Sequence, residues 1–403
     1  LFAARVRAAA KRGAQVSVVH AADEDLLMPV AHKAIVAPSR WAAVLAEVLV
    51  AALQAQGRVA PAALSAAVSI DLAAVVPGEG ARAIAASLSS GERCAVLLGN
   101  AAVQHPDYAR IARLAQAVAA AGAARFGQIG DAANSVGGYL ARAVPSGGGL
   151  DARAMVEQPR NLYLLLNNEP TLDHAMPAVA RAALAKAESV IALSVYRSPE
   201  LLELADCLLP IAPFTETAGT FVNCEGRVQG FNGVVRPAGE ARPAWKVLRV
   251  LANRLGLAGF DHDSPEAVRA EALAPDVIGH LDNALSDEPA PAARAVATGP
   301  LERLADVPIY AADPLVRRAV SLQQTKDARS ARARASGATI ARLGLAAGDT
   351  VRATQQLAGT AGEATLELER DDALADGVVR IAAAQPATAG LVCAFGAISI
   401  EKA

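Results

Sequence analysis

The sequence predicts an α/β protein with parallel, doubly wound sheets and a small C-terminal β-barrel-like domain. Its 403 residues exceed what one hydrophobic core usually supports, so two or three domains are expected. Short apolar strands alternate with helical segments up to residue 211, which is typical of parallel sheets. From residue 336 onward, short β-type runs are separated by Gly and Asp, as in small barrels. We therefore expect domains at residues 1–90, 91–330 and 331–403.

The composition excludes several classes of protein. Apolar residues make up 53% of the chain, charged residues 19% and aromatic residues 3%, which argues against a disordered or collagen-like chain. The 38 Lys and Arg residues nearly balance 40 Asp and Glu residues, giving a formal charge of −2. No global field therefore draws the chain onto nucleic acid or anionic lipid, and such a partner would need a local patch.

The first domain is expected to be Rossmann-like, with a β-rich run at Gln15–His20. Ser39 is expected to cap a helix at Trp41–Leu53. Leu1 leads directly into helix-type sequence, with neither an initiating Met nor a signal-peptide pattern. We therefore expect this domain to be truncated at its N-terminus.

The second domain continues the α/β alternation. An apolar strand at Ala95–Asn100 ends in Gly, and a helix at Tyr108–Ala121 is closed by Gly122. A second buried strand is expected at Leu162–Leu166. Further elements are expected at residues 178–187 (helix), 190–195 (strand), 199–205 (helix) and 207–211 (strand). These units are too short for the eight full repeats of a TIM barrel and favour a doubly wound sheet.

A polar segment rich in Gly and hydroxyl groups, residues 213–236, predicts a long functional loop or hairpin. Pro243 then begins an amphipathic helix that ends at Gly256 and whose apolar face contains Val247, Leu248, Leu251 and Leu255. Residues 260–330 are acidic and then rich in Pro and Ala, which predicts surface helices and a wrapping linker. The closing barrel is expected to use strands at residues 350–355, 365–369 and 378–383.

Several familiar motifs are absent from the sequence. It contains no GxxxxGK[ST], GxSxG or HExxH motif, and no GxGxxG after a strand. Its four cysteines, Cys94, Cys207, Cys224 and Cys393, are too widely spaced for a zinc-ribbon or local iron–sulfur motif. We expect them to be buried, inert thiols of a protein from a reducing compartment. The charge-free stretch from residue 381 to 400 contains Gln, Pro, Thr and Gly, so it predicts strands and turns rather than a membrane span.

Two further groups of residues suggest ligand sites. His20, Asp23, Asp25 and His32 are close in sequence and of the types that bind zinc or iron, but a polar loop after a strand is the favoured interpretation. The Gly-rich run 127–138 offers backbone N–H groups to a phosphate. Structural packing is the favoured role for that run, because nothing fixes a phosphate-binding helix N-terminus there.

The charged residues give weaker signals. One basic cluster carries no aromatic residue for base stacking, which favours a solvated helix or a subunit contact over nucleic-acid binding. It comprises Arg317, Arg318, Lys326, Arg329, Arg332 and Arg334. Glu216 and Glu225 lie nine positions apart with no His nearby, so they are not assigned as an acid–base pair.

The segment Ala205–Gln229 reads ADCLLPIAPFTETAGTFVNCEGRVQ. It closely resembles the ADVVLP…E…GTFxNxEGRVQ segment of the molybdopterin oxidoreductase superfamily. Further segments make nearly the whole chain similar to one branch of it, the family of the largest peripheral-arm subunit of bacterial respiratory complex I (NADH-quinone oxidoreductase). These are Leu26–Lys33, Ala133–Gly137, Gly239–Leu248, Ala312–Arg318 and Phe395–Ala403.

This resemblance implies the molybdoenzyme fold without molybdopterin, acting as a scaffold in an NADH:quinone oxidoreductase, a translocase. It implies contacts with other peripheral-arm subunits, at the cytoplasmic side of the bacterial inner membrane, with membrane association only through the complex and no nucleic acid. Iron–sulfur clusters are expected in an N-terminal region outside this segment, which itself carries no catalytic or metal residue. The polar segment then marks a vestigial pocket, with candidate residues Thr215, Glu216, Gly219, Thr220, Asn223, Glu225, Gly226 and Arg227.

Two alternatives remain open from the sequence. The chain is similar enough to the wider superfamily to be the C-terminal half of a true molybdopterin-dependent enzyme, such as a formate-dehydrogenase-like protein. In the other alternative, the basic cluster between residues 317 and 334 binds RNA, which the near-neutral net charge disfavours.

Overall fold

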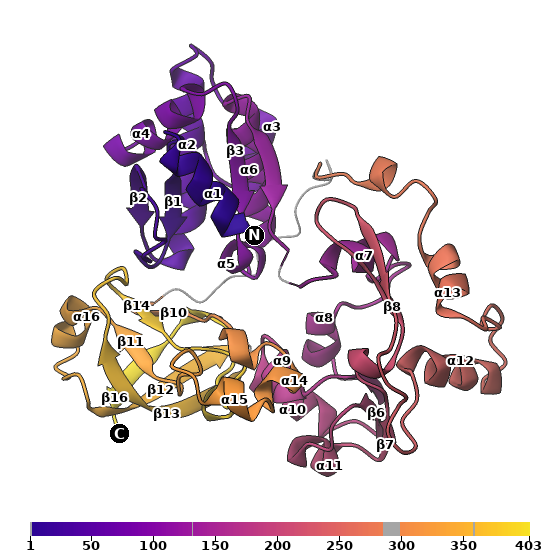
Figure 1. The fold of residues 1–403 in the computed structure, drawn as a ribbon. Coiled ribbons are helices and arrows are strands. Elements are labelled where there is room, and N and C mark those ends of the chain that lie inside the picture. Colours follow the sequence, from indigo (N-terminus) through magenta and orange to yellow (C-terminus); the bar gives the residue numbers. More distant parts are fainter. Residues whose placement is uncertain (1, 131, 285–298, 358) are drawn as a thin grey trace.

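The computed structural model describes residues 2–130, 132–284, 299–357 and 359–403 (Figure 1). Its N-terminal part contains two parallel strand pairs, β1 with β2 and β3 with β4, surrounded by helices. The elements are α1 (Phe2–Lys11), β1 (Ser17–His20), β2 (His32–Ile35), η1 (Pro38–Arg40), α2 (Trp41–Gln54), α3 (Ala62–Val68), α4 (Glu79–Ser89), β3 (Ala95–Leu98), α5 (Asn100–Val103), α6 (Tyr108–Ala121) and β4 (Arg125–Gln128).

The core of this part forms around α2, which packs against α4 and α6. Small alanine side chains on these helices allow close approach, and Leu49, Ile111 and Leu114 fill the space between them. The core continues onto the C-terminal sheet through Leu304 and Phe395.

Ser39 does not cap α2 as the sequence predicted. The 3₁₀ helix η1 runs directly into α2, and no side chain caps it. Instead, the Ser39 hydroxyl donates to Glu302 Oε1 at 2.5 Å and its backbone N–H donates to Oε2 at 3.1 Å. Glu302 is buried, and a buried carboxylate needs hydrogen-bond donors, so Ser39 serves a contact between distant segments that no local pattern reveals.

The middle of the chain forms a parallel three-stranded sheet in the order β5-β6-β7. Its helices include α10, whose small residues pack on Tyr163 and Val190 of the sheet. The elements are α7 (Ser135–Leu140), α8 (Ala152–Glu157), β5 (Leu162–Leu166), α9 (Pro170–Asp173), α10 (Pro177–Leu184), β6 (Ser189–Ser194), α11 (Pro199–Leu204) and β7 (Cys207–Pro210).

The predicted polar loop is a β-hairpin followed by two helices. The hairpin strands pair antiparallel, and helices α12 and α13 lie beyond them at the edge of the molecule (Figure 1). The elements are η2 (Phe214–Glu216), β8 (Gly219–Val222), β9 (Val228–Phe231), α12 (Ala244–Arg254), α13 (Pro265–Ala272) and η3 (Ile278–His280). The apolar face predicted for α12 is not buried in a core: only Ala252 of the helix is buried, and Leu255 is 65% exposed.

The C-terminal part is a curled seven-stranded sheet in the order β15-β10-β14-β11-β13-β12-β16 (Figure 1). It takes in β10, which precedes residue 331 and pairs with β14 and β15. The elements are β10 (Glu302–Leu304), η4 (Ile309–Ala311), α14 (Pro314–Arg317), α15 (Val320–Gln323), β11 (Ala333–Ala335), α16 (Gly337–Arg342), β12 (Thr350–Leu357), β13 (Thr360–Arg370), β14 (Val378–Arg380), η5 (Pro386–Thr388), β15 (Phe395–Ala397) and β16 (Ser399–Lys402). Much of the predicted Pro- and Ala-rich linker lies outside the described residues.

Arg303, on β10, is buried inside the curled sheet and is 2% exposed. Its guanidinium donates to the carbonyl oxygens of Ile381, Ala382 and Cys393 and to Gln355 Oε1. Burial lowers the pKa of this guanidinium to about 10. The contacts give every N–H of the group an acceptor, so the side chain ties three segments of the sheet together.

No helix among the described residues has both the length and the apolar character needed to cross a bilayer.

Candidate functional site

The hairpin of β8 and β9 holds most of the predicted pocket residues, and local hydrogen bonds fix its tip. Asn223 Oδ1 accepts from the backbone N–H of Glu225 at 3.0 Å and of Arg227 at 2.9 Å. Asn side chains favour turns because they can bond the backbone a few residues on. Asn223 is therefore occupied in shaping the tip rather than available to a ligand.

Two predicted glycines of the hairpin have structural reasons to be glycine. Gly226 has φ +78°, and a Cβ there would lie 2.5 Å from Leu281 Cδ1. At Gly219 a Cβ would lie 2.5 Å from Phe231 Cζ, so the ring of Phe231 fills the space that a side chain would need. The backbone conformation at Gly226 and the close approach of Phe231 at Gly219 thus both favour a residue without a side chain.

The remaining pocket candidates do not converge on one point. Glu216 Oε2 accepts from the backbone N–H of Ala238 at 2.9 Å. Glu225 is exposed and lies 3.4 Å from Arg5 of α1. Thr215 is half-buried and accepts a backbone bond from Val234 through its carbonyl. Of the two further candidates, Arg227 is exposed and Thr220 is half-buried.

The Gly-rich run 127–138 lies against the hairpin. Asn134 Oδ1 accepts from the backbone N–H of Val222 at 2.8 Å, and α7 packs against β8. A Cβ on Gly137 would lie 2.1 Å from Asn134 Oδ1, so this glycine leaves room for the amide that holds the hairpin. The run packs against a neighbouring backbone here, which is the role the sequence favoured for it.

The resemblance raises the question of whether these residues could bind molybdopterin dinucleotide. The phosphates of this cofactor need several convergent hydrogen-bond donors or cations. The backbone N–H groups of Val222, Glu225 and Arg227 are already bonded within the protein. Glu216 and Glu225 add negative charge, and the cavity that Gly219 and Thr220 help to line measures only about 150 Å³. The predicted hairpin residues therefore do not fit the dinucleotide.

The residues suggested as metal ligands each contact a different neighbouring group. His20 Nδ1 accepts from the backbone N–H of Ala22, and its ring stacks on Trp41. Asp23 pairs with Lys33 at 2.6 Å, while Asp25 accepts from the backbone N–H of Leu27. Within the described residues, no group of three or more His, Cys, Asp or Glu side chains gathers as a metal site.

The cysteines are less buried than the sequence predicted. Cys207 and Cys224 are exposed, which corrects the expectation of buried thiols, because β7 and the hairpin tip lie at the surface. Cys94 and Cys393 are partly buried, and burial raises the pKa of the Cys393 thiol.

The basic cluster is largely engaged in ion pairs. Arg317 contacts Glu169 at 2.9 Å and Asp173 at 2.5 Å, and Arg318 also pairs with Glu169 and lies over the Tyr196 ring. Further along, Arg332 pairs with Glu367 and Glu369, and Arg334 pairs with Glu369. Four of the six basic residues are thus paired with carboxylates, which reduces the positive charge that they offer to a polyanion.

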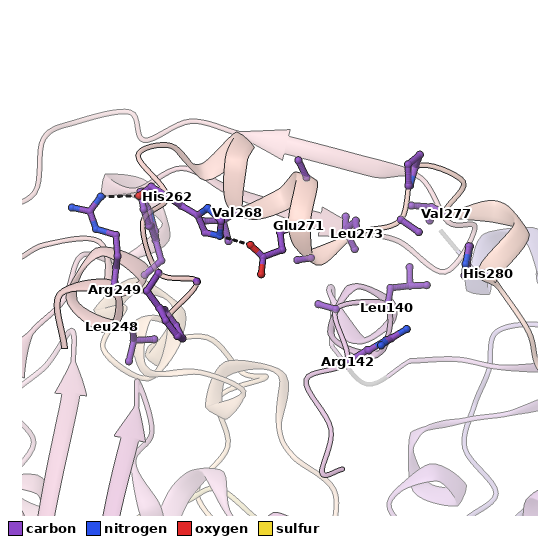
Figure 2. Close-up of a pocket in the computed structure, with 18 of the residues that line it drawn as sticks. Leu140, Arg142, Leu248, Arg249, His262, Val268, Glu271, Leu273, Val277 and His280 are labelled. Carbon is purple, nitrogen blue, oxygen red and sulfur yellow. Dashed lines mark hydrogen bonds and ion pairs between the residues drawn. The ribbon is translucent and has the colours of Figure 1, made fainter. Parts of the chain in front are cut away.

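A cavity of about 850 Å³, which the sequence did not reveal, lies between α12, α13 and the end of α7. Its walls are mostly apolar, including Leu140, Leu248, Val268, Leu273 and Val277, as Figure 2 shows. The size falls in the range of small-molecule sites. The only signal in the sequence was the amphipathic pattern of α12, which predicted contact with a core rather than an open cleft.

The polar groups of this cavity are few and of mixed charge. His262 Nε2 lies 2.6 Å from Glu271 Oε2, and Arg249 donates to the backbone oxygen of His262 at 2.7 Å (Figure 2). His280 and Arg142 lie at the far end. The lining thus contains two arginines and two histidines beside one carboxylate, Glu271.

Comparison with known proteins shows where this chain belongs. It is 32% identical over 215 residues to the G subunit of NADH-quinone oxidoreductase from Streptomyces coelicolor, which covers 51% of this chain and 24% of that protein. It is 40% identical over 78 residues to the mitochondrial NADH-ubiquinone oxidoreductase 78 kDa subunit of Candida albicans, 19% of this chain and 11% of that protein. It is also 44% identical over 67 residues to a putative formate dehydrogenase of Staphylococcus aureus, 17% of this chain and 7% of that protein. The chain thus spans a minor part of the length of each of these relatives.

The fold is also similar to a solved structure. Acetylene hydratase from Pelobacter acetylenicus matches with a TM-score of 0.64 at 14% identity, covering 98% of this chain and 74% of that one. The family model described as molybdopterin oxidoreductase matches residues 26–254, more than half of the chain. With its parallel sheets, its hairpin and its curled C-terminal sheet, the chain belongs to the molybdopterin oxidoreductase family.

Proposed function

We propose that this chain is a scaffold part of a peripheral-arm subunit of respiratory complex I and supports electron transfer from NADH to quinone without a catalytic centre of its own. The carrying observation is the hairpin, where the side chains of Asn223 and Glu216 and the backbone N–H of Val222 are bonded within the protein. The similarity to the G subunit of NADH-quinone oxidoreductase over about half of this chain supports the same assignment.

Partners and location follow from this proposal. The chain would contact other peripheral-arm subunits, lie at the cytoplasmic side of the bacterial inner membrane, and meet the membrane only through the complex. The iron–sulfur clusters of the subunit would lie outside this segment, since its four cysteines are widely spaced in the sequence. We propose that no molybdopterin is bound in the native assembly.

The second candidate is part of a formate-dehydrogenase-like molybdoenzyme. It is favoured by the 44% identity to the putative formate dehydrogenase of Staphylococcus aureus, although that match extends over only 67 residues. The two candidates differ in what the hairpin does. In a scaffold, the hairpin affects how much complex assembles, whereas in a molybdoenzyme it affects turnover through the bound cofactor.

The test compares two hairpin variants in native cells that carry an epitope tag on this chain. Gly226→Val strains a positive φ and clashes with Leu281, whereas Arg227→Ala removes an exposed side chain next to it. We expect Gly226→Val to lower the amount of assembled NADH:quinone oxidoreductase without changing its turnover per complex. Arg227→Ala should change neither. A loss of turnover per complex in Arg227→Ala, or purification of the tagged chain with formate oxidation and no NADH:quinone activity, would contradict the proposal.

A further inference from the structure

The 850 Å³ cavity between α12, α13 and the end of α7 has an apolar middle and polar groups at both ends (Figure 2). At one end, His262 Nε2 lies 2.6 Å from Glu271 Oε2. Arg249 Nη1, at the same end, donates to His262 O at 2.7 Å and lies 3.3 Å from Asp263 Oδ1. Each of these acidic groups therefore has a nitrogen partner within the protein, and the charges at this end are largely paired.

The other end of the cavity carries a cation without an acidic partner. Arg142 lines the cavity there, and its guanidinium has no hydrogen-bond or ion-pair partner within residues 2–130, 132–284, 299–357 and 359–403. His280 lines the same end, and its Nδ1 donates to Asp276 O at 2.6 Å. Because Nδ1 carries that proton, Nε2 of His280 donates to an anion only when the ring is protonated. Arg142, by contrast, is always charged and presents a planar fork of N–H donors.

The backbone at Arg142 favours a different residue type. Its φ is +56°, just after α7, where helices commonly end in glycine. The Arg142 N–H donates to Tyr139 O at 3.0 Å, and the N–H of Ala143 donates to Gly138 O at 2.9 Å, so this conformation closes the helix. Arginine is less favourable than glycine in a left-handed conformation, which indicates that the side chain serves a purpose there.

We propose that this cavity binds a medium-chain acyl carboxylate, with the carboxylate at Arg142 and the chain between Leu248, Val268 and Leu273. Small-molecule sites combine mostly apolar walls with a few polar groups that set the orientation of the ligand. A carboxylate accepts two N–H bonds from one guanidinium, so Arg142 favours an anion over an uncharged or cationic head group. In the part of the chain that the structure describes, neither hairpin strand lines this cavity, so binding there is separate from the function proposed above.

The test uses the epitope-tagged chain purified from native cells in the assembly that it forms. The probe is dodecanoic acid with a photoreactive diazirine on its chain, and mass spectrometry of the digested protein locates the crosslinks. We expect crosslinks within residues 140–142 and 245–280. Dodecanoate should compete with the probe at least about tenfold better than dodecanol or dodecyltrimethylammonium, which lack the negative charge. Acetate, which lacks the apolar chain, should not compete at the same concentration.

Three variants test the role of Arg142. Arg142→Gly removes the guanidinium and suits the positive φ, so it should not lower the amount of folded chain. Half-saturation of crosslinking should then need at least about fivefold more probe. Arg142→Lys keeps the charge and should stay within about threefold of the parent. Arg254→Gln is the matched control, because Arg254 is exposed on α12 but does not line the cavity, and it should change half-saturation by less than about twofold.

Several results would overturn the proposal. These are an absence of crosslinks in the cavity, equal competition by dodecanol, and unchanged half-saturation in Arg142→Gly. An equal loss in Arg254→Gln would also overturn it, because surface charge in general would then be the cause. If Arg142→Gly is not recovered in folded form, Arg142→Gln replaces it, with the same expected loss of affinity.

Discussion

Gly137 and Gly138 are neighbours in α7 with opposite surroundings, and they provide a matched pair for the link between α7 and the hairpin. A Cβ on Gly137 would meet Asn134 Oδ1 at 2.1 Å, whereas a Cβ on Gly138 has nothing within 4 Å. Asn134 is the residue that accepts from Val222 of β8. The consequence of a methyl group therefore differs sharply between two adjacent positions of one helix.

We expect Gly137→Ala to lower the free energy of unfolding by roughly 1–3 kcal/mol, because it displaces Asn134 and leaves the Val222 N–H without its acceptor. Gly138→Ala should be neutral or stabilising by up to about 1 kcal/mol, since Ala is the better helix former. Chemical denaturation of both variants is the measurement. Equal stabilities for the pair would show that the Asn134 contact does not hold the hairpin.

His105 is a single residue that makes the free energy of unfolding depend on pH. It is 6% exposed between Trp41 and Phe395, and burial lowers the pKa of its imidazole to about 4 from an ordinary value of 6.5. The unfolded chain therefore binds a proton at pH values where the folded chain does not, so the free energy of unfolding falls as pH drops from 6.5 to 4. The difference between the two pKa values lowers the free energy of unfolding by about 3 kcal/mol over this pH range.

His105→Asn keeps an acceptor for the Asp107 N–H and removes the titration. We expect its stability to vary less with pH between 6.5 and 4 than that of the parent. Urea denaturation at pH 7, 5.5 and 4.5 tests this, with His280→Asn, at an exposed position, as the control. Parallel pH profiles for the parent and His105→Asn would contradict a neutral, buried His105.

Between the middle sheet and the C-terminal part, one link is the ion-pair cluster of Glu169 and Asp173 at α9 with Arg317 and Arg318 at α14. Glu169 has a side chain only 5% exposed and receives both Arg317 and Arg318. Burial by itself would raise the pKa of the Glu169 carboxyl, but the two guanidinium groups outweigh it and hold that pKa below its ordinary value. The contribution of this carboxylate is therefore present above its unfolded pKa and is lost as pH falls through the lower folded value.

We expect Glu169→Ala to destabilise the chain by about 3 kcal/mol, since it leaves buried guanidinium charge without its partner. Glu203→Ala is the control. Glu203 also pairs with an arginine, Arg181, but its side chain is 63% exposed, so its loss should cost less than about 1 kcal/mol. Thermal and urea denaturation of both variants measure the difference. Similar losses for the two would mean that the α9–α14 cluster does not hold the two parts together.

Elements with a clear local pattern were predictable from sequence. The strand at Leu162–Leu166 and the helix at Tyr108–Ala121 have the predicted bounds, because apolar periodicity and a closing Gly act locally. β10 was not predicted, since a three-residue strand with Glu302 and Arg303 has no apolar pattern. The charges of Glu302 and Arg303 can be buried because Ser39 and carbonyl groups of distant segments form hydrogen bonds with them. These contacts depend on the tertiary structure, which the local sequence does not reveal.

Some features of the candidate site could likewise be predicted from the local sequence, and others could not. The Gly- and hydroxyl-rich composition of residues 213–236 predicted a loop or hairpin, and the structure has a hairpin there, with a positive φ at Gly226. The occupation of Asn223, Glu216 and Asn134 by backbone partners depends on how segments dock, which composition does not encode. The 850 Å³ cavity likewise depends on the placement of α12 and α13 relative to α7.

For the whole molecule, the positions of the cysteines predict that the chain does not assemble an iron–sulfur cluster. Cys94, Cys207, Cys224 and Cys393 lie in separate segments, and no metal-binding group gathers among the described residues. After anaerobic reconstitution with iron and sulfide, we expect no stoichiometric cluster signal in electron paramagnetic resonance. A signal near one per chain that Cys207→Ser or Cys224→Ser abolishes would refute this.

Asn223 and Glu216 are bonded within the protein, and we propose that the hairpin is a structural element rather than a cofactor site. Molybdenum and tungsten analysis of the native assembly, together with oxidative release of fluorescent pterin, tests this proposal. We expect neither metal nor pterin in stoichiometric amount, alongside intact NADH:quinone activity. Near-stoichiometric metal and pterin would contradict it and establish the chain as part of a molybdoenzyme.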